Sequence, residues 1–324
     1  MRWASLLFVL ILPLYSCGGG SAPASSPALV NNDGANETPP TTSTTSPPPS
    51  TPPSPPPEPE VVAIDYGWGA ESNQFGILYR LDPAEDSLPV VVMIHGGCWL
   101  DDYTLDLQTD LSIALAEEGF AVWNIEFRRL GNGGEWPVIF QDITAARDFL
   151  ATLATTYDHP LDLTAVTAMG HSSGGHLALW LAGSDQLDPT SDIYSPTDIP
   201  IKGVVGLGPI TDLNSPICRT SVSRLIADSG LDPTERATRI AETSPKAMLP
   251  LGIASIMISG AADAIAPPNV TQQYVDAAVE AGDYSEHLVI DGADHFYLID
   301  RNAIDISLLA DSLRAVMDRT NDSN

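Results

Sequence analysis

The stretch Ala165-Val-Thr-Ala-Met-Gly-His-Ser-Ser-Gly-Gly-His176 decides the fold that this sequence predicts. Its apolar start, residues 166–169, is typical of a buried strand, and the apolar residues from Leu177 to Leu181 indicate a helix. Between them, Gly170-His-Ser-Ser-Gly174 fits the Gly-x-Ser-x-Gly pattern, in which a serine stands on a tight turn from strand to helix. We therefore expect the Ser172 hydroxyl to be exposed at the carboxyl edge of a sheet. An ordinary glycine-serine turn in a βα unit is the alternative.

Around this turn, apolar runs of strand length alternate with segments of helical spacing. We expect strands at 61–66, 75–81, 90–94, 121–127, 166–169, 203–207, 253–259 and 287–290, and helices at 105–118, 140–157, from the serine turn to 182, and at 221–227, 233–242, 270–281 and 304–317. The first two strands resemble a hairpin. The alternation predicts an α/β fold, with a mostly parallel eight-stranded sheet, helices on both faces and a small cap insert at 221–242.

The amino-terminal segment is typical of an exported protein. Met1-Arg2 and the apolar run Trp3–Leu14 are too short to span a bilayer comfortably and indicate a signal peptide. The run ends in Leu14-Tyr-Ser-Cys-Gly18, which resembles the lipobox of bacterial lipoproteins, where the cysteine becomes the lipidated first residue. We expect a signal peptide at 1–17, lipidation at Cys17 and a place in the cell envelope. A plain secretory signal with a chance cysteine is the alternative.

Residues 18–60 predict a stalk. They consist mainly of Ser, Thr, Pro and Gly, so they cannot bury enough surface to offset the entropy cost of ordering. Pro47–Pro49 and Pro55–Pro57 favour polyproline II and stiffen the segment. One folded domain is therefore expected at 61–324, long enough for a large core. A wall-spanning spacer with an incidental domain is an alternative interpretation.

The chain is strongly acidic, with 14 Lys and Arg against 42 Asp and Glu and a formal net charge of −28. Such a surface repels nucleic acid and anionic membranes, so neither is an expected partner. The membrane is expected to hold the chain only through the lipid anchor. We interpret the acidic composition as an aid to solubility in a salty exterior, and not as an acidic tail with a function of its own. The oligomeric state is not predicted.

Four segments that follow predicted strands carry groups suited to acyl transfer. The carboxyl ends of parallel strands meet at one edge of a sheet, so these groups are expected to lie together. They are His95-Gly-Gly-Cys-Trp99, Ser172, Asp263 and His295. A serine hydroxyl needs an imidazole to take its proton, and the imidazole needs an acid to fix its tautomer. We therefore expect Ser172 as nucleophile, His295 as base and Asp263 as acid.

Other titratable residues are less well placed. Four of the six histidines stand before or at the start of a strand, beside the nucleophile or on a helix, and are expected to be packing or surface residues: His159, His171, His176 and His287. Asp294 is adjacent to the base and Asp291 stands on the last strand, so both are weaker candidates for the acid. A solvated loop carboxylate is the alternative for Asp263.

The developing oxyanion needs preorganised N–H donors. One expected donor is the amide of Ser173, at the amino end of the helix after the serine. The others are expected from the loop His95–Cys98, where absent Cβ atoms let the backbone approach a substrate. A tight turn after a strand is the alternative for this loop. Trp99 is expected to line the substrate pocket, or else to be a core aromatic residue.

Three segments of the sequence together resemble those of one known family. They are His95-Gly-Gly-Cys-Trp99, Glu126-Phe-Arg-Arg129 and Gly170-His-Ser-Ser-Gly-Gly-His-Leu177. From about residue 61 to 317 the chain resembles the α/β-hydrolase superfamily, whose triad also follows the order Ser, Asp, His. The nearest resemblance is to its His-Gly-Gly-x-Trp branch, with kynurenine formamidase-like and small carboxylesterase-like members. The resemblance implies the α/β-hydrolase fold, no cofactor or metal, a triad of Ser172, Asp263 and His295, and oxyanion donors at Gly97, Cys98 and Ser173.

Three cysteines are present. If Cys17 carries lipid, Cys98 and Cys218 remain as a possible pair in an oxidising compartment, with two free thiols as the alternative. In the fold that the resemblance implies, both stand on loops at the carboxyl edge of the sheet. That placement favours a disulfide between the oxyanion loop and the segment after the sixth strand.

We expect a serine hydrolase that cleaves a small or medium carboxylic ester through an acyl-enzyme on Ser172. An arylformamidase that acts on an N-formylkynurenine-type amide and a small peptidase are the rival enzymes. The anchor and stalk argue against the formamidase, because formamidases of the resembling branch are typically soluble intracellular enzymes. A binding module on a hydrolase scaffold is the non-enzymatic alternative, although none of the three triad residues is missing.

Overall fold

The computed structural model describes residues 60–83 and 87–319. The predicted signal peptide at 1–17, with Cys17, and residues 18–59 of the predicted stalk lie outside the described residues. Glu60, the last residue of the predicted stalk, already belongs to the first strand. None of the described helices is both long and apolar enough to cross a membrane.

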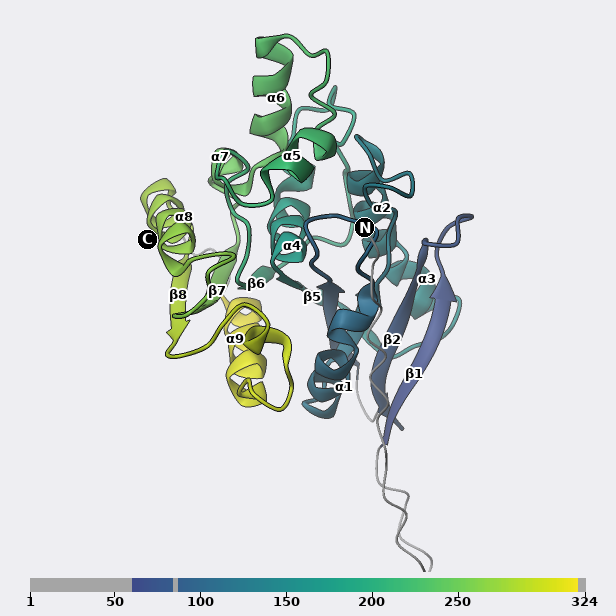
Figure 1. Ribbon diagram of the computed structural model, residues 1–324. Helices are drawn as coiled ribbons and strands as arrows, with labels where there is room; N and C mark the ends of the chain where they lie inside the picture. The colour runs from purple at the N-terminus through teal and green to yellow at the C-terminus, as the bar shows by residue number, and fades with distance from the viewer. Residues whose placement is uncertain (1–59, 84–86, 320–324) are drawn as a thin grey trace, which may run out of the picture. The chain divides into compact units, whose positions relative to one another are not determined.

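The domain is organised around one eight-stranded sheet, with the order β1-β2-β4-β3-β5-β6-β7-β8 (Figure 1). The strands are β1 (Glu60–Gly67), β2 (Phe75–Asp82), β3 (Leu88–Ile94), β4 (Ala121–Ile125), β5 (Leu161–His171), β6 (Gly203–Leu207), β7 (Ala254–Gly260) and β8 (Ser285–Ile290). Strand β2 runs antiparallel to both β1 and β4, and all the other neighbouring strands are parallel. The predicted hairpin and the predicted mostly parallel sheet are confirmed.

Helices cover both faces of the sheet (Figure 1). They are α1 (Thr109–Glu117), α2 (Val138–Asp148), α3 (Leu150–Thr155), α4 (Ser173–Gly183), α5 (Arg219–Leu225), α6 (Pro233–Thr243), α7 (Pro245–Met248), α8 (Pro268–Ala281) and α9 (Ile306–Asp318), with short 3-10 helices η1 (Leu105–Gln108), η2 (Ser184–Gln186) and η3 (Tyr297–Ile299). Helices α1 and α9 pack on one face, and α2, α3, α4 and α8 pack on the other.

The central strands are continuous apolar runs because both of their faces are buried. In β3, Val90, Val92 and Ile94 contribute to the core under α4, whereas Val91 and Met93 contribute to the core under α1 and α9. This alternation follows from the two-residue period of a strand. A buried sheet of this kind holds the carboxyl ends of β3, β5, β7 and β8 on one rigid edge.

Two predicted helices differ from the structure in detail. The segment expected at 105–118 begins with the 3-10 helix η1 before α1, and the segment expected at 140–157 is divided into α2 and α3 at Phe149. The predicted cap is present as α5 and α6, followed by α7. Asp232 caps the amino end of α6, and its side chain accepts from the amides of Thr234 and Glu235 in a capping box. Pro245 starts α7 after the turn at Ser244.

Candidate active site

Ser172 stands on the tight turn between β5 and α4, where the motif predicts it. Its backbone dihedrals are φ 56° and ψ −119°, an unusual conformation for a residue with a side chain. The Ser172 amide donates to the carbonyl of Leu207 at 2.9 Å, which ties the turn to the next strand. A Cβ atom on Gly174 would overlap the carbonyl oxygen of Ile94, so this close crossing of α4 over β3 requires glycine.

His295 and Asp263 form a buried hydrogen-bonded pair. The distance from His295 Nδ1 to Asp263 Oδ2 is 2.7 Å, and the other carboxylate oxygen accepts from the amides of Ile265 and Ala266, each at 2.8 Å. Burial raises the pKa of the Asp263 carboxyl, but the hydrogen bonds from His295 and the two amides outweigh it and hold the pKa below its ordinary value. An ionised carboxylate only accepts, so Nδ1 donates and Nε2 of the neutral ring is left to take a proton.

His171 supports the backbone of His295. Its Nε2 donates to the carbonyl of His295 at 3.0 Å, and the two ring centroids are 4.4 Å apart. Burial, and to a smaller extent the neighbouring imidazole of His295, lowers the pKa of His171 to about 3. The His171 ring is therefore neutral at physiological pH. The sequence predicts His171 only as a packing or surface residue. Its contact with His295 becomes visible only once β5 and the loop after β8 are brought together.

Ser172 and His295 line one pocket of about 130 Å³, together with Gly97 and Cys98. The other side chains around it are His171, Leu100, Tyr103, Leu107, Ile265 and Phe296. Three of these, Tyr103, Ile265 and Phe296, are 39, 46 and 51% exposed, although they are large and apolar or aromatic. The mouth of the pocket therefore presents apolar surface to solvent, which favours substrates with an apolar portion. None of these three residues was predicted from the sequence, because exposure depends on the folded loops.

The predicted oxyanion donors lie beside Ser172. Gly97, Cys98 and Ser172 line the same pocket, and Ser173 is the first residue of α4, so its amide has no acceptor within the helix. Among the described residues, the amides of Gly97 and Cys98 donate to no protein acceptor. Gly97 has φ +114°, and a Cβ there would collide with the ring of Tyr103. The arrangement can supply N–H donors to an oxyanion formed at Ser172.

Trp99 does not line this pocket, which corrects the prediction for that residue. It is 1% exposed and belongs to the core, with its ring packed edge-on against His176 at a centroid distance of 5.1 Å. Cys98 and Trp99 have φ of 52° and 60°, and this left-handed turn directs the indole toward α4. The Trp99 amide donates to Ser173 Oγ at 3.3 Å, so Trp99 anchors the oxyanion loop to α4.

Cys98 and Cys218 form a disulfide, with Cα atoms 5.6 Å apart and a sequence separation of 120. Cys218 immediately precedes α5 of the cap. The bond therefore connects the loop after β3 to the segment between β6 and α5, and the predicted pairing of Cys98 with Cys218 is confirmed.

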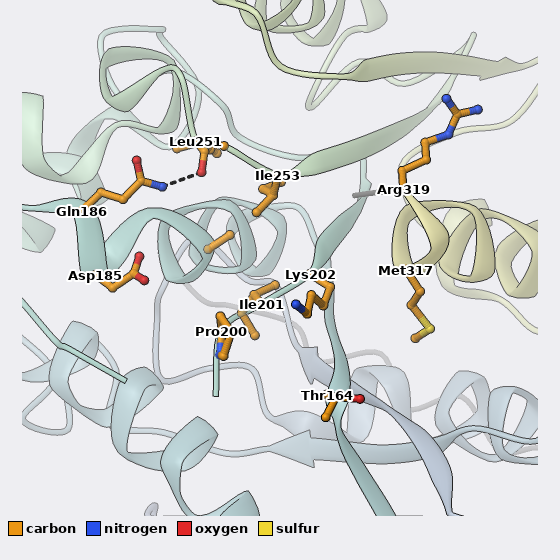
Figure 2. A pocket seen from close by; sticks show the side chains of 12 residues that line it. Thr164, Asp185, Gln186, Pro200, Ile201, Lys202, Leu251, Ile253, Met317 and Arg319 are labelled. Carbon is orange, nitrogen blue, oxygen red and sulfur yellow. Dashed lines mark hydrogen bonds between the residues drawn. The ribbon is translucent and has the colours of Figure 1, made fainter. Parts of the chain in front are cut away.

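A larger pocket of about 670 Å³ lies at the opposite edge of the sheet (Figure 2). Thr164, Lys202 and Ile253 stand near the amino ends of β5, β6 and β7, and no residue of this pocket lines the pocket at Ser172. Within the part of the chain that the structure describes, no three His, Cys, Asp or Glu side chains are grouped so that they could hold a metal ion. Of the predicted catalytic residues, Ser172 and His295 line the smaller pocket and none lines the larger one.

A family model described as BD-FAE matches residues 78–276. The chain belongs to the BD-FAE family. This is an esterase family of the α/β-hydrolase type, which confirms the resemblance to that superfamily. The matched range in this BD-FAE protein contains Ser172 and Asp263 and ends before His295. Among the curated proteins, none matches the chain significantly.

Solved structures share the fold of this BD-FAE domain. A truncated carbohydrate esterase from gut microbiota is 20% identical with a TM-score of 0.64, over 79% of this chain and 97% of that one. Esterase B from Lactobacillus rhamnosis, inhibited by a tributyrin phosphonate, is 18% identical with a TM-score of 0.66, over 80% of this chain and 86% of that one. An acetyl ester-xyloside bifunctional hydrolase from Caldicellulosiruptor lactoaceticus is 16% identical with a TM-score of 0.63, over 80% and 97%. At these identities the likeness shows the α/β-hydrolase fold.

Proposed function

We propose that this protein hydrolyses carboxylic esters through an acyl-enzyme on Ser172. His295 Nε2 takes the proton of the Ser172 hydroxyl as Oγ attacks the ester carbonyl carbon, and the amides of Gly97, Cys98 and Ser173 stabilise the oxyanion. The imidazolium then gives its proton to the leaving alcohol, and water, activated by the same ring, releases the carboxylic acid. The observation that carries the proposal is the pocket shared by Ser172 and His295, with Asp263 bonded to the far side of the imidazole.

Covalent labelling tests this mechanism directly. An alkyl phosphonate p-nitrophenyl ester should react once per chain, release one p-nitrophenol and abolish turnover of p-nitrophenyl acetate. Peptide mass mapping should place the phosphonyl group on Ser172. Labelling at another residue, or a fully labelled protein that still turns over the ester, would reject the acyl-enzyme. A faster reaction with N-formylkynurenine than with any ester would favour the arylformamidase.

The small pocket favours a short acyl group. We expect kcat/KM for p-nitrophenyl octanoate to be at least about tenfold lower than for the acetate, because even one methylene that a pocket cannot hold costs about 10- to 200-fold. The measurement is a series of p-nitrophenyl esters from acetate to octanoate under identical conditions. Rates that rise steadily with chain length would contradict a short acyl site.

Leu107 offers a matched variant for that series, since its partly buried side chain is one wall of the pocket. Leu107→Ala should raise the octanoate to acetate ratio of kcat/KM by about tenfold, which is the effect of the added room. Val279→Ala, at an exposed position on α8 outside the pocket, should leave the ratio unchanged.

We propose also that Cys17 carries a lipid that attaches the domain to the bacterial envelope. The lipobox-like sequence before Cys17 and the proline-rich segment after it support this proposal. In cells grown with labelled palmitate, the full chain should incorporate label, and Cys17→Ala should not. Ser172→Ala should be labelled like the wild type, which separates the anchor from any acyl-enzyme. Undiminished label in Cys17→Ala would reject Cys17 as the anchor.

A further inference from the structure

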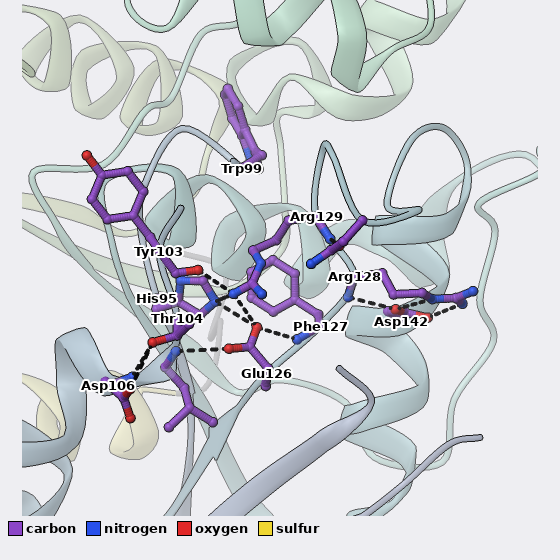
Figure 3. A network of polar contacts seen from close by, with 12 residues as sticks. His95, Trp99, Tyr103, Thr104, Asp106, Glu126, Phe127, Arg128, Arg129 and Asp142 are labelled. Carbon is purple, nitrogen blue, oxygen red and sulfur yellow. Dashed lines mark hydrogen bonds and ion pairs between the residues drawn. The ribbon is translucent and has the colours of Figure 1, made fainter. Parts of the chain in front are cut away.

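A buried ion pair lies beneath the oxyanion loop, which we define as residues 95–105 (Figure 3). Arg129 Nη1 is 2.6 Å from Glu126 Oε1, and their side chains are only 4 and 2% exposed. Burial raises the pKa of the Glu126 carboxyl, but contact with His95, the charge of Arg129 and the amide of Phe127 outweigh it and lower the pKa below its ordinary value. A buried pair of charges is costly to desolvate and is weak evidence for stability alone. The presence of this buried ion pair therefore calls for an explanation other than stability.

The pair contacts both ends of the oxyanion loop. At the start of the loop, His95 Nε2 is 3.3 Å from Glu126 Oε1. At its end, the amide of Leu105 donates to Glu126 Oε2 at 3.1 Å, and Arg129 Nη1 donates to the carbonyl of Tyr103. Figure 3 shows these contacts converging on the two charged groups. The two ends of the loop are thus held by a single pair of side chains.

The middle of the loop needs such support because its conformation is unfavourable. Gly97, Cys98 and Trp99 have φ of 114°, 52° and 60°, and the last two carry side chains that disfavour the left-handed region. This segment carries the proposed donor amides of Gly97 and Cys98. The ring of Tyr103 packs directly over Gly97, so a shift of Tyr103 is transmitted to the donors.

Resting on the proposed acyl-enzyme at Ser172, we propose that Glu126 and Arg129 are positioning residues that fix the oxyanion donors of Gly97 and Cys98. Neither side chain lines the pocket, so neither touches the substrate. They act by holding His95, Tyr103 and Leu105 while the loop between them faces the reacting carbonyl. Oxyanion donors act mainly in the transition state, so their displacement lowers kcat and leaves KM nearly unchanged.

The adjacent arginine provides a matched control. Arg128 forms its own ion pair with Asp142 on α2, with Nη2 to Oδ1 at 2.6 Å and Nε to Oδ2 at 2.8 Å. Asp142 is as buried as Glu126, so the loss of either arginine leaves a buried carboxylate without its partner. The Arg128 side chain bonds to α2 and not to the oxyanion loop. Both variants therefore leave a buried carboxylate without its arginine, although Arg128 is itself 26% exposed and Arg129 4%. They differ in whether the lost arginine contacts the oxyanion loop.

The test compares Arg129→Met with Arg128→Met by kcat, KM and the rate of Ser172 phosphonylation. We expect Arg129→Met to lower kcat and the phosphonylation rate by about 10- to 100-fold, with KM within about twofold, because small misplacements of oriented groups cost about this much. Arg129→Lys, which keeps the charge, should restore part of the loss. Arg128→Met should lower Tm comparably and keep kcat within about threefold of the wild type, since it spares the donors.

Two outcomes would overturn the proposal: a wild-type kcat in Arg129→Met, or an equal loss of kcat in Arg128→Met. If Arg129→Met does not fold, Glu126→Gln is assayed in the same way. It keeps the shape and an acceptor oxygen while removing the charge, and a wild-type kcat in that variant overturns the proposal as well. Phosphonylation of the wild type is measured first. Its failure to label Ser172 would sink the acyl-enzyme itself, a result distinct from labelled enzyme with unaffected variants.

Discussion

Replacing Ser172 by alanine is expected to lower kcat for p-nitrophenyl acetate by about 10⁴- to 10⁶-fold, because the covalent route is lost and only binding and the oxyanion donors remain. The side chain lost is a single hydroxyl on the turn between β5 and α4, so the fold should be unaffected. Far-ultraviolet circular dichroism and Tm, measured on the same samples, would verify this. The residual rate reports how much the pocket alone contributes.

Ser184→Ala is a suitable control for that variant. Ser184 is also buried, at the carboxyl end of α4, and its hydroxyl donates to the carbonyl of Leu181. Loss of this hydrogen bond costs about 1 kcal/mol of stability and should not change kcat. Substantial turnover by Ser172→Ala, free of wild-type enzyme, would show that another residue is the nucleophile and would remove the proposed mechanism.

The sheet could be predicted because its signals are local. Apolar runs such as β3 and β6 are strands buried on both faces, and the glycine-rich turn around Ser172 can join a strand to a helix only through a close crossing. The chain order of Ser172, Asp263 and His295, after the strands β5, β7 and β8, could also be predicted. Their meeting at one rim follows from parallel topology, which alternating strands and helices predict.

Residue roles that depend on side-chain direction could not be predicted. Trp99 follows the oxyanion glycines, so proximity in sequence suggests the pocket, but two left-handed residues send its indole into the core. From the sequence alone, the segment Glu126-Phe-Arg-Arg129 indicates only a family resemblance and no role for its residues. That Arg129 faces the oxyanion loop while Arg128 faces α2 follows from the turn after β4. No periodic pattern in the sequence indicates in which direction each of these two arginine side chains points.

The second large effect is expected for Asp263→Asn, which should lower kcat by about 10⁴-fold with little change in fold, since the same exchange in a serine protease triad imposes the wrong histidine tautomer. The structure gives the reason. The amides of Ile265 and Ala266 both donate to Asp263 Oδ1, so the oxygen of an asparagine is held at that position. Its NH2 group must then face His295 Nδ1 and donate to it. Nδ1 becomes an acceptor, Nε2 carries the proton, and the ring can no longer deprotonate Ser172.

Variants of the neighbouring carboxylates serve as controls, because they show whether the loss of any nearby negative charge would lower kcat. Asp294 stands beside the base, and its Oδ1 accepts from the amides of Phe296 and Tyr297, which an asparagine oxygen can also do. Asp294→Asn should therefore keep kcat within about threefold of the wild type, because it leaves the tautomer of His295 unchanged. Asp291→Asn should behave in the same way. If Asp291→Asn or Asp294→Asn lost activity while Asp263→Asn kept it, the acid would have to be reassigned. The 2.7 Å contact at Nδ1 would then be structural only.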